Sequence, residues 1–596
     1  MANIPVKKKS PKADAIRSSE SSTGVRRSRR RKHIMYIQQR DEQEDQAKSS
    51  PTKVQSTNKP STGNRSRSTT TTKIQSTPND PERQKREEIR HMSRWIEMII
   101  KEGWPLSSVD DEAYRDKIGL SSDITLQQNQ VAEVILAMNQ LVMKKIGSEM
   151  KAARRGAILH SEGIESSRYI VGIVASYMVG PKVTQTLLAL GEVHELRSVV
   201  KRCSTRQDTT MTADSIAEKH ARYIQQQVFS DRYDFNSREL QKWLVCQTAI
   251  TCNAITKVAS LLGIPHVDCQ SQLLDKQVKQ MLERTKGTTF GVGQLISEVR
   301  EVIKTAQESK YSSDELRNFL RILDDKEEGW SSGATMIAKF HAKKSDILKA
   351  VQHEDEKIIV RCNSLINSDR ATKQAQKMLQ NLKFIQRRLT TKGHPLSSCR
   401  EDIQSLLDYA DAHSHDIESQ WFDHKLGTKY IHPLSKKLKD VNFISGVCKI
   451  QRKKFALLND VETTACQQLK RPTMAASPVG RADDFKAFVC RKERQASLPS
   501  RDNISLRSIY HLEEEYSDCD FIIGSSSEME KVWSDARQHK AAQDDTISVA
   551  LFEAIMMLRY NWRLWDASTV GDAVEYVKSN TSDEQGQKSK KRRYAT

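Results

Sequence analysis

Two neighbouring segments near the C-terminal end decide the predicted fold, Phe521–Ser534 (FIIGSSSEMEKVWS) and Ile547–Asn561 (ISVALFEAIMMLRYN). In the first segment, three apolar residues predict a short strand, the serines predict a turn, and a helix carrying Glu528 and Glu530 follows. In the second segment, apolar residues recur every three or four positions, which predicts a strongly amphipathic helix. A strand, a turn and two helices therefore follow one another at this end of the chain.

The amphipathic helix presents more apolar surface than a chain end can leave in water. Its apolar face must be covered either by the chain's own core or by a second subunit. We expect the second arrangement, a homodimer or higher assembly formed through this helix. The residues expected at that interface are Leu551, Phe552, Ile555, Leu558, Trp562 and Trp565.

Positive charge is concentrated at the two ends of the chain. The 596 residues hold 96 Lys and Arg against 76 Asp and Glu, a net charge of +20. Residues 1–90 alone hold 22 Lys and Arg against 10 Asp and Glu, and residues 583–596 hold five against two. Such tails favour contact with DNA phosphates, which is independent of base sequence and weakens with salt. A tail that only solubilises or targets the protein is the alternative. The residues expected to contact phosphates are Arg26, Arg27, Arg29, Arg30, Arg31 and Lys32.

Compartment signals point to the nucleus. The basic cluster in the first tail and a second one at the C-terminal end both have the density of nuclear import signals. The N-terminus lacks the apolar core of a secretory signal, and no apolar run reaches 18 residues, so no membrane partner is expected. Ten cysteines without a Cys-x-x-Cys pair favour a reduced intracellular protein. The second cluster comprises Lys588, Lys590, Lys591, Arg592 and Arg593.

The middle of the chain predicts an α/β core. After two long helices that end near Ala153, the hydrophobic period changes from that of helices to that of strands. The expected order is three strands, a helix, a strand, a helix, a strand and a helix, which is similar to the order of the RNase H-like α/β fold. The expected strands are 157–160, 169–179, 196–203, 243–248 and 264–269, and the expected helices are 212–229, 253–262 and 273–282.

Taken together, these segments resemble the hAT superfamily of DNA transposases over about residues 92–575. The C-terminal pair of segments is the most specific match, because in that family a serine-rich turn and a Glu-containing helix precede the dimerisation helix. The resemblance implies an RNase H-like mixed sheet with a large helical insertion. Further matches in the family's order are Arg94 with Trp95, 105–109 (PLSSV), 156–160 (GAILH), 262–269 (LGIPHVDC), Trp330 with Ser331, and 425–430 (KLGTKY).

The resemblance also divides the chain into domains. The fold class is α/β plus all-α, preceded by an N-terminal tail whose composition of Ser, Thr, Lys and Arg predicts disorder. The expected parts are a disordered basic tail (1–82), a helical pre-catalytic segment (83–155), the RNase H-like core (156–285), a helical insertion (286–470), a linker (471–508), the dimerisation region (509–580) and a second basic tail (581–596).

Members of this family cut and rejoin DNA with three carboxylates that hold paired Mg²⁺ ions. The first should follow the 157–160 strand, where this chain has Ser161 and Glu162. Ile250 stands at the second position, and isoleucine cannot bind Mg²⁺. The third matches Glu530, so the vestigial positions are Glu162, Ile250 and Glu530 and no resident metal or other cofactor is expected. The alternative is an active Mg²⁺-dependent transposase with shifted carboxylates, in which Glu162 and Asp268 stand in for the missing ligands.

Other family features are also replaced. Gln272 stands where the family's Cys-x-x-His signature has its histidine, and Gly329 stands where the insertion motif has its arginine. No cysteine precedes Cys203, so an N-terminal zinc finger of the type common in this family is not expected. The sequence therefore predicts a transposase-derived, catalytically inactive nuclear protein that dimerises and binds DNA. A protein-interaction scaffold without a DNA role stays open as a further alternative.

Overall fold

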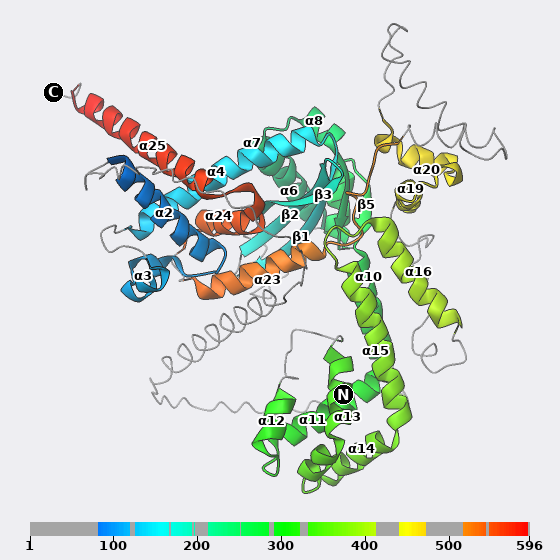
Figure 1. Ribbon diagram of the computed structural model, residues 1–596. Helices are drawn as coiled ribbons and strands as arrows, with labels where there is room; N and C mark the ends of the chain where they lie inside the picture. The colour runs from blue at the N-terminus through cyan, green and yellow to red at the C-terminus, as the bar shows by residue number, and fades with distance from the viewer. Residues whose placement is uncertain are drawn as a thin grey trace, which may run out of the picture. The chain divides into compact units, whose positions relative to one another are not determined.

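The computed structural model describes residues 81–119, 126–165, 168–193, 196, 213–250, 252–284, 291–321, 330, 332–412, 440–471, 516–543 and 547–593 (Figure 1). The tail expected over residues 1–82, the linker expected over 471–508 and the 425–430 match lie outside these residues or overlap them by no more than two positions. The described chain is mostly helical and contains one five-stranded mixed sheet. The predicted combination of an α/β part with an all-α part is confirmed at this level.

Three consecutive antiparallel strands and two parallel strands make up the sheet, in the order β3-β2-β1-β4-β5. The antiparallel strands are β1 (Gly156–Glu165), β2 (Arg168–Val179) and β3 (Lys182–Glu192). On the other side of β1, β4 (Leu244–Ala249) and β5 (His266–Asp268) run parallel to it. The strand β4 is buried along its whole length, as expected of a strand covered on both faces.

The third strand does not lie where the sequence placed it. Residues 197–203 are outside the described part, and the strand that pairs with β2 is β3, directly after a two-residue turn. Gly180 closes that turn with a φ of +59°, a left-handed conformation that glycine adopts without strain. The overlooked signal was this Gly-Pro turn, which folds the next apolar run back onto β2.

Helices from both ends of the chain share one core with the sheet. The helix α2 (Pro81–Ile100) packs beside α25 (Ala567–Arg593), and both lie against α4 (Gln128–Ala152) (Figure 1). Ion pairs join Lys85 to Glu575 at 2.6 Å and Lys578 to Glu88 at 2.9 Å. The two long helices predicted before Ala153 are confirmed as α2 and α4. A short helix, α3 (Glu112–Ile118), follows the 3₁₀ turn at Leu106–Asp110.

The open edge of the sheet, β3, is covered by α24 (Val549–Tyr560) and the residue that follows it. The Asn561 side chain accepts from the Leu187 amide at 3.1 Å and donates to the Leu187 carbonyl at 2.9 Å. The Leu190 amide donates to Glu553 at 3.2 Å. Side chains from the C-terminal region therefore satisfy backbone groups that an edge strand would otherwise expose.

A second group of helices forms before β4 and between β4 and β5. The helix α6 (Ala213–Arg222) continues into a π-helical turn, Tyr223–Ser230, and packs against α9 (Asn253–Leu261). Gln247 of β4 donates to the Ile255 carbonyl at 3.1 Å, so α9 lies on the sheet face to which Gln247 points. The other short helices here are α7 (Asp231–Tyr233) and α8 (Ser237–Trp243).

The helical part after β5 has its own hydrophobic core. The sequence predicted a helix over residues 273–282 and a helical insertion after it, in agreement with these elements. The helices are α10 (Gln270–Arg284), α11 (Val292–Glu308), α12 (Asp314–Arg321), α13 (Ser332–Val351), α14 (Glu356–Asn367), α15 (Asp369–Leu389) and α16 (Leu396–Ala412).

The last part of the expected insertion packs with the sheet instead. The helices α19 (Val441–Gln451) and α20 (Asp460–Ala465) share a core with Ala157, Cys246 and Val267 of β1, β4 and β5. Residues 440–469 are thus separated from the core of the other insertion helices. Among the described residues, no helix is both long and apolar enough to cross a membrane.

Candidate functional site

The apolar face of α24 is buried within this chain. Ile555 and Leu558 are fully buried, Leu551 and Trp565 nearly so, and Phe552 packs partly buried against the same core. The sequence allowed this face to be buried either in the chain's own core or against a second subunit. The structure shows it buried in the chain's own core. A dimer contact through these residues would require the fold to open. Trp562 alone of the predicted set is 63% exposed.

The second basic cluster does not begin a separate tail. Backbone helix continues along α25 as far as Arg593, so Lys588, Lys590, Lys591, Arg592 and Arg593 lie on its last turns. The six basic residues expected to contact phosphates, Arg26, Arg27, Arg29, Arg30, Arg31 and Lys32, lie outside the described residues.

Two of the positions expected to carry catalytic carboxylates lie side by side, one within β1 and one directly after β4. His160 of β1 is paired with Ala249 of β4, so Ser161 and Ile250 are the next residues at adjacent strand positions. The helix α23 (Ser527–Ala542) packs against β1 and β2. Its Trp533 Nε1 donates to Ser161 Oγ at 3.2 Å. Glu530 lies one helical turn before Trp533, so Ser161, Ile250 and Glu530 come to one edge of the sheet.

Glu530 is held by a side chain from the start of α10. Gln272 Nε2, in the first turn of α10, donates to Glu530 Oε1 at 2.9 Å. Glu528, on the same helix, is buried and pairs with Lys531 at 2.6 Å and with the Tyr560 hydroxyl at 3.1 Å. Its contacts therefore link α23 to α24, whereas Glu530 is the carboxylate at the sheet edge.

Glu162 lies on the opposite face of the sheet from Ser161, because side chains alternate along a strand. Its carboxylate accepts a hydrogen bond from Tyr169 and lies 3.6 Å from His220 Nδ1 of α6. The register β1–β4–β5 places Asp268 on the same face as His160 and Glu162. Both stand-in carboxylates are thus on the face opposite to Ser161, which Trp533 contacts.

A buried cluster of titratable groups occupies that opposite face. His160 and His220 are fully buried with ring centroids 5.5 Å apart, and Tyr169 lies 5.2 Å from His220. Burial lowers the pKa of His160 to about 3 and that of His220 to about 4, so both imidazoles are neutral at pH 7. Burial raises the pKa of Glu162, and the hydrogen bond from Tyr169 opposes that shift.

This pair of histidines was missed as a cluster in the sequence, although the signal was present. His160 and Glu162 alternate on a strand, and His220 lies on the inward side of the following helix. No group of three or more His, Cys, Asp or Glu side chains in the described part of the chain is arranged to hold a metal ion. The expectation that the protein carries no cofactor stays a prediction.

The serine-rich turn before α23 is fixed to the start of α10. Ser525 and Ser271 share a hydrogen bond of 2.9 Å, and the Ser526 amide donates to Cys269 Sγ at 3.2 Å. Thr248 of β4 donates to the Ile523 carbonyl at 3.0 Å. The strand expected at 521–523 is reduced to a bridge between Ile523 and Pro395. These contacts position α23 against the sheet. They engage Ser525 and Ser526 in hydrogen bonds to Ser271 and Cys269, and not to a histidine that could activate a serine as a nucleophile.

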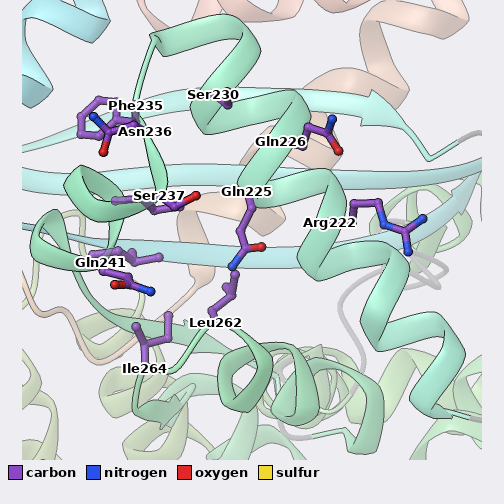
Figure 2. Close-up of a pocket in the computed structure, with 12 residues that line it drawn as sticks. Arg222, Gln225, Gln226, Ser230, Phe235, Asn236, Ser237, Gln241, Leu262 and Ile264 are labelled. Atoms are coloured by element: carbon purple, nitrogen blue, oxygen red, sulfur yellow. The ribbon is translucent and has the colours of Figure 1, made fainter.

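A groove lies between the π-helical turn and α8 (Figure 2). Its volume is about 440 Å³. Six amide or hydroxyl side chains, five apolar side chains and one arginine line it, and no carboxylate of the described residues does, so its polar chemistry is limited to hydrogen bonding and the charge of that arginine. The polar residues that define it include Arg222, Gln225, Gln226, Asn236, Ser237 and Gln241. No sequence pattern had indicated this groove.

A scan against protein-family models and a search of curated proteins each find no match for this chain. Function is therefore argued from the residues and their geometry.

Proposed function

We propose that the chain is a transposase-derived nuclear protein that has lost phosphoryl-transfer activity and binds DNA through phosphate contacts of its basic terminal segments. One observation carries the proposal. Where β1, β4 and α23 meet, Ser161 and not Glu162 lies beside Ile250, and of Ser161, Ile250 and Glu530 only Glu530 is acidic.

The strand order supports an RNase H-like core. A meander of three antiparallel strands is followed by two parallel strands on the other side of β1, each of which follows a helix. A helix from the far C-terminal part of the chain, α23, then returns to β1 and β2 after a long helical region. This is the arrangement that the resemblance to hAT transposases implies.

The chemistry of the edge supports loss of catalysis. Two-metal phosphoryl transfer needs several carboxylate oxygens that converge on ions about 4 Å apart. Here the hydroxyl of Ser161 is bonded to Trp533, and Ile250 offers no oxygen. The side-chain amide of Gln272 donates a hydrogen bond to the Glu530 carboxylate. Self-association through α24 is not part of this proposal, because that helix face is buried.

Loss of catalysis predicts that supercoiled plasmid is not nicked in a Mg²⁺-dependent manner. The wild-type chain and the Glu530→Ala variant should give the same background rate within about twofold, because one carboxylate cannot assemble the metal pair. Agarose-gel quantification of nicked circles with Mg²⁺ or with chelator measures this. Glu133→Ala, at an exposed position of α4, is the matched control. Nicking by the wild type that disappears only in Glu530→Ala would establish an active transposase.

DNA binding through the first basic cluster predicts a strong dependence on salt. Replacing Arg26, Arg27, Arg29, Arg30, Arg31 and Lys32 by alanine should reduce the slope of log affinity against log salt by up to about 5 on duplex DNA, since each phosphate contact contributes about 0.9. Fluorescence anisotropy with a labelled duplex between 50 and 200 mM salt gives the slope. A second variant, with the five basic residues at 588–593 replaced, tests the other end. A wild-type chain that binds no duplex would favour the scaffold alternative.

A further inference from the structure

The C-terminal half of α15 carries positive charge around an exposed aromatic ring. Phe384 is 60% exposed, although it lies on a helix whose other apolar residues are largely buried. Arg387 follows one turn later and is exposed, and Lys392 is exposed just beyond the helix end. The Arg388 guanidinium lies 6.0 Å from the centre of the Phe384 ring.

This basic surface adjoins the sheet edge that holds Glu530. The Thr390 carbonyl, at the end of α15, accepts from Ser527 Oγ at 3.4 Å and from Lys531 Nζ at 3.5 Å, both on α23. Lys392 Nζ lies 5.2 Å above the ring of Tyr560, which also contacts α23 through Glu528. The end of α15 and the start of α23 therefore form one continuous region.

Two of these cations are held in ion pairs. Arg388 Nε donates to Asp402 at 2.7 Å, and Lys531 pairs with the buried Glu528. For Arg387 and Lys392, no carboxylate lies within ion-pair distance among the residues that the structure describes. A favourable interaction with the helix dipole accounts for basic residues in a last turn, but it does not account for an exposed phenylalanine beside them.

We propose that Phe384, Arg387 and Lys392 form a binding surface for a single strand of nucleic acid. Arg387 and Lys392 contact successive phosphates, and an unpaired base stacks on the Phe384 ring, which is open to solvent. Aromatic side chains beside a basic track are the usual means of binding single strands without sequence preference, whereas a base within a duplex has no free face. The inference rests on the proposed DNA binding and adds a surface of the folded body to the terminal contacts.

The test compares a labelled 20-nucleotide oligo-dT with a duplex of the same length. Both are measured by anisotropy with the full chain in which the six basic residues at 26–32 and the five at 588–593 are alanine, so that the terminal segments do not mask the surface. Phe384→Ala should weaken oligo-dT binding by about 5- to 100-fold, the range expected for one stacked base. Arg387→Gln with Lys392→Gln should reduce the single-strand salt slope by about 1.4, because each phosphate contributes about 0.7.

Matched controls use exposed residues elsewhere on the chain. Val360→Ala removes an exposed apolar side chain from α14, and Lys242→Gln with Lys349→Gln removes two exposed charges. Both should change oligo-dT binding by less than about twofold, in line with the small effects of isolated surface changes. Circular dichroism melting of every variant should match the parent, which separates loss of binding from loss of folding.

Three results would overturn the inference. Unchanged oligo-dT binding in both surface variants would remove it while leaving tail-mediated DNA binding intact. Equal losses on the duplex and on oligo-dT would show a general phosphate surface and not a single-strand site. Displacement of oligo-dT by poly-glutamate at equal charge concentration would indicate an acidic protein partner. If the unaltered chain bound neither probe, the proposed function itself would fail first.

Discussion

Replacing Ile555 by aspartate is expected to unfold the chain and not to separate a dimer. Ile555 is fully buried where α24 packs against α4 and β3. An unpaired carboxylate at such a position costs several kcal/mol or forces water into the core. Because whole domains are stable by only about 5–15 kcal/mol, the variant should lose most of its cooperative unfolding transition.

Urea unfolding followed by circular dichroism measures this loss, and light scattering reports the mass of what stays soluble. Trp562→Ala is the control, since Trp562 belongs to the same predicted interface but is 63% exposed. Its change in unfolding free energy should stay within about 0.5 kcal/mol. A monomeric Ile555→Asp variant with a native spectrum, from a dimeric wild type, would restore the dimer interface and contradict the buried packing.

Stability is expected to fall steeply as the pH drops below about 6.5. Burial lowers the folded-state pKa of His160 to about 3 and of His220 to about 4, while an unfolded histidine titrates near 6.5. Between these values the unfolded chain binds protons that the folded chain does not. Each histidine therefore removes about 1.4 kcal/mol of unfolding free energy per pH unit. The full stability is present above pH 6.5.

The neighbours of the two rings modify this slope. Glu162 on β1 has a raised pKa, so its protonation favours the folded state and partly offsets the loss at the acidic end of the window. Tyr169 on β2 and Cys252 before α9 also lie near the cluster. Burial raises the pKa of both groups, so neither ionises as the pH falls.

Urea unfolding at several pH values between 7.5 and 4.5 tests the effect. His220→Leu removes one titrating group, so its slope should be smaller by about 1.4 kcal/mol per pH unit over the window. His353→Leu is the control, because His353 is exposed. If the wild type and His220→Leu lost stability in parallel as the pH fell, the buried histidine would not be the cause.

The parts of the fold that the sequence predicted are those with strong periodicity. The helices α2 and α4, and the strands β1, β2, β4 and β5, each carry an apolar pattern long enough to be recognised. The strand β3 was missed although it contains the apolar run 187–190 (LLAL), because the turn at Gly180 that pairs it with β2 was not recognised. Turn chemistry at single residues is easily overlooked when the apolar run is read alone.

The register of β1 and the surface against which α24 is buried could not be predicted from the sequence. The predicted first strand ended at His160, and the real one continues to Glu165, so the face of Glu162 could not be deduced. A shift of one residue moves a side chain to the other face of a sheet. The amphipathic pattern of α24 is equally consistent with an internal core and with a subunit contact, because both bury the same stripe. Only the long-range packing of α24 on α4 and β3 decides between them.

Glu553 and Asn561, whose side chains hydrogen-bond to the backbone of β3, also protect this edge strand from pairing with other chains. A chain shortened before Val549 would lose Asn561 and Glu553 together, and with them the hydrogen bonds to Leu187 and Leu190. The rim of the sheet would then be a template on which a neighbouring copy can add a strand. Truncation before Val549 is therefore expected to make the protein aggregate.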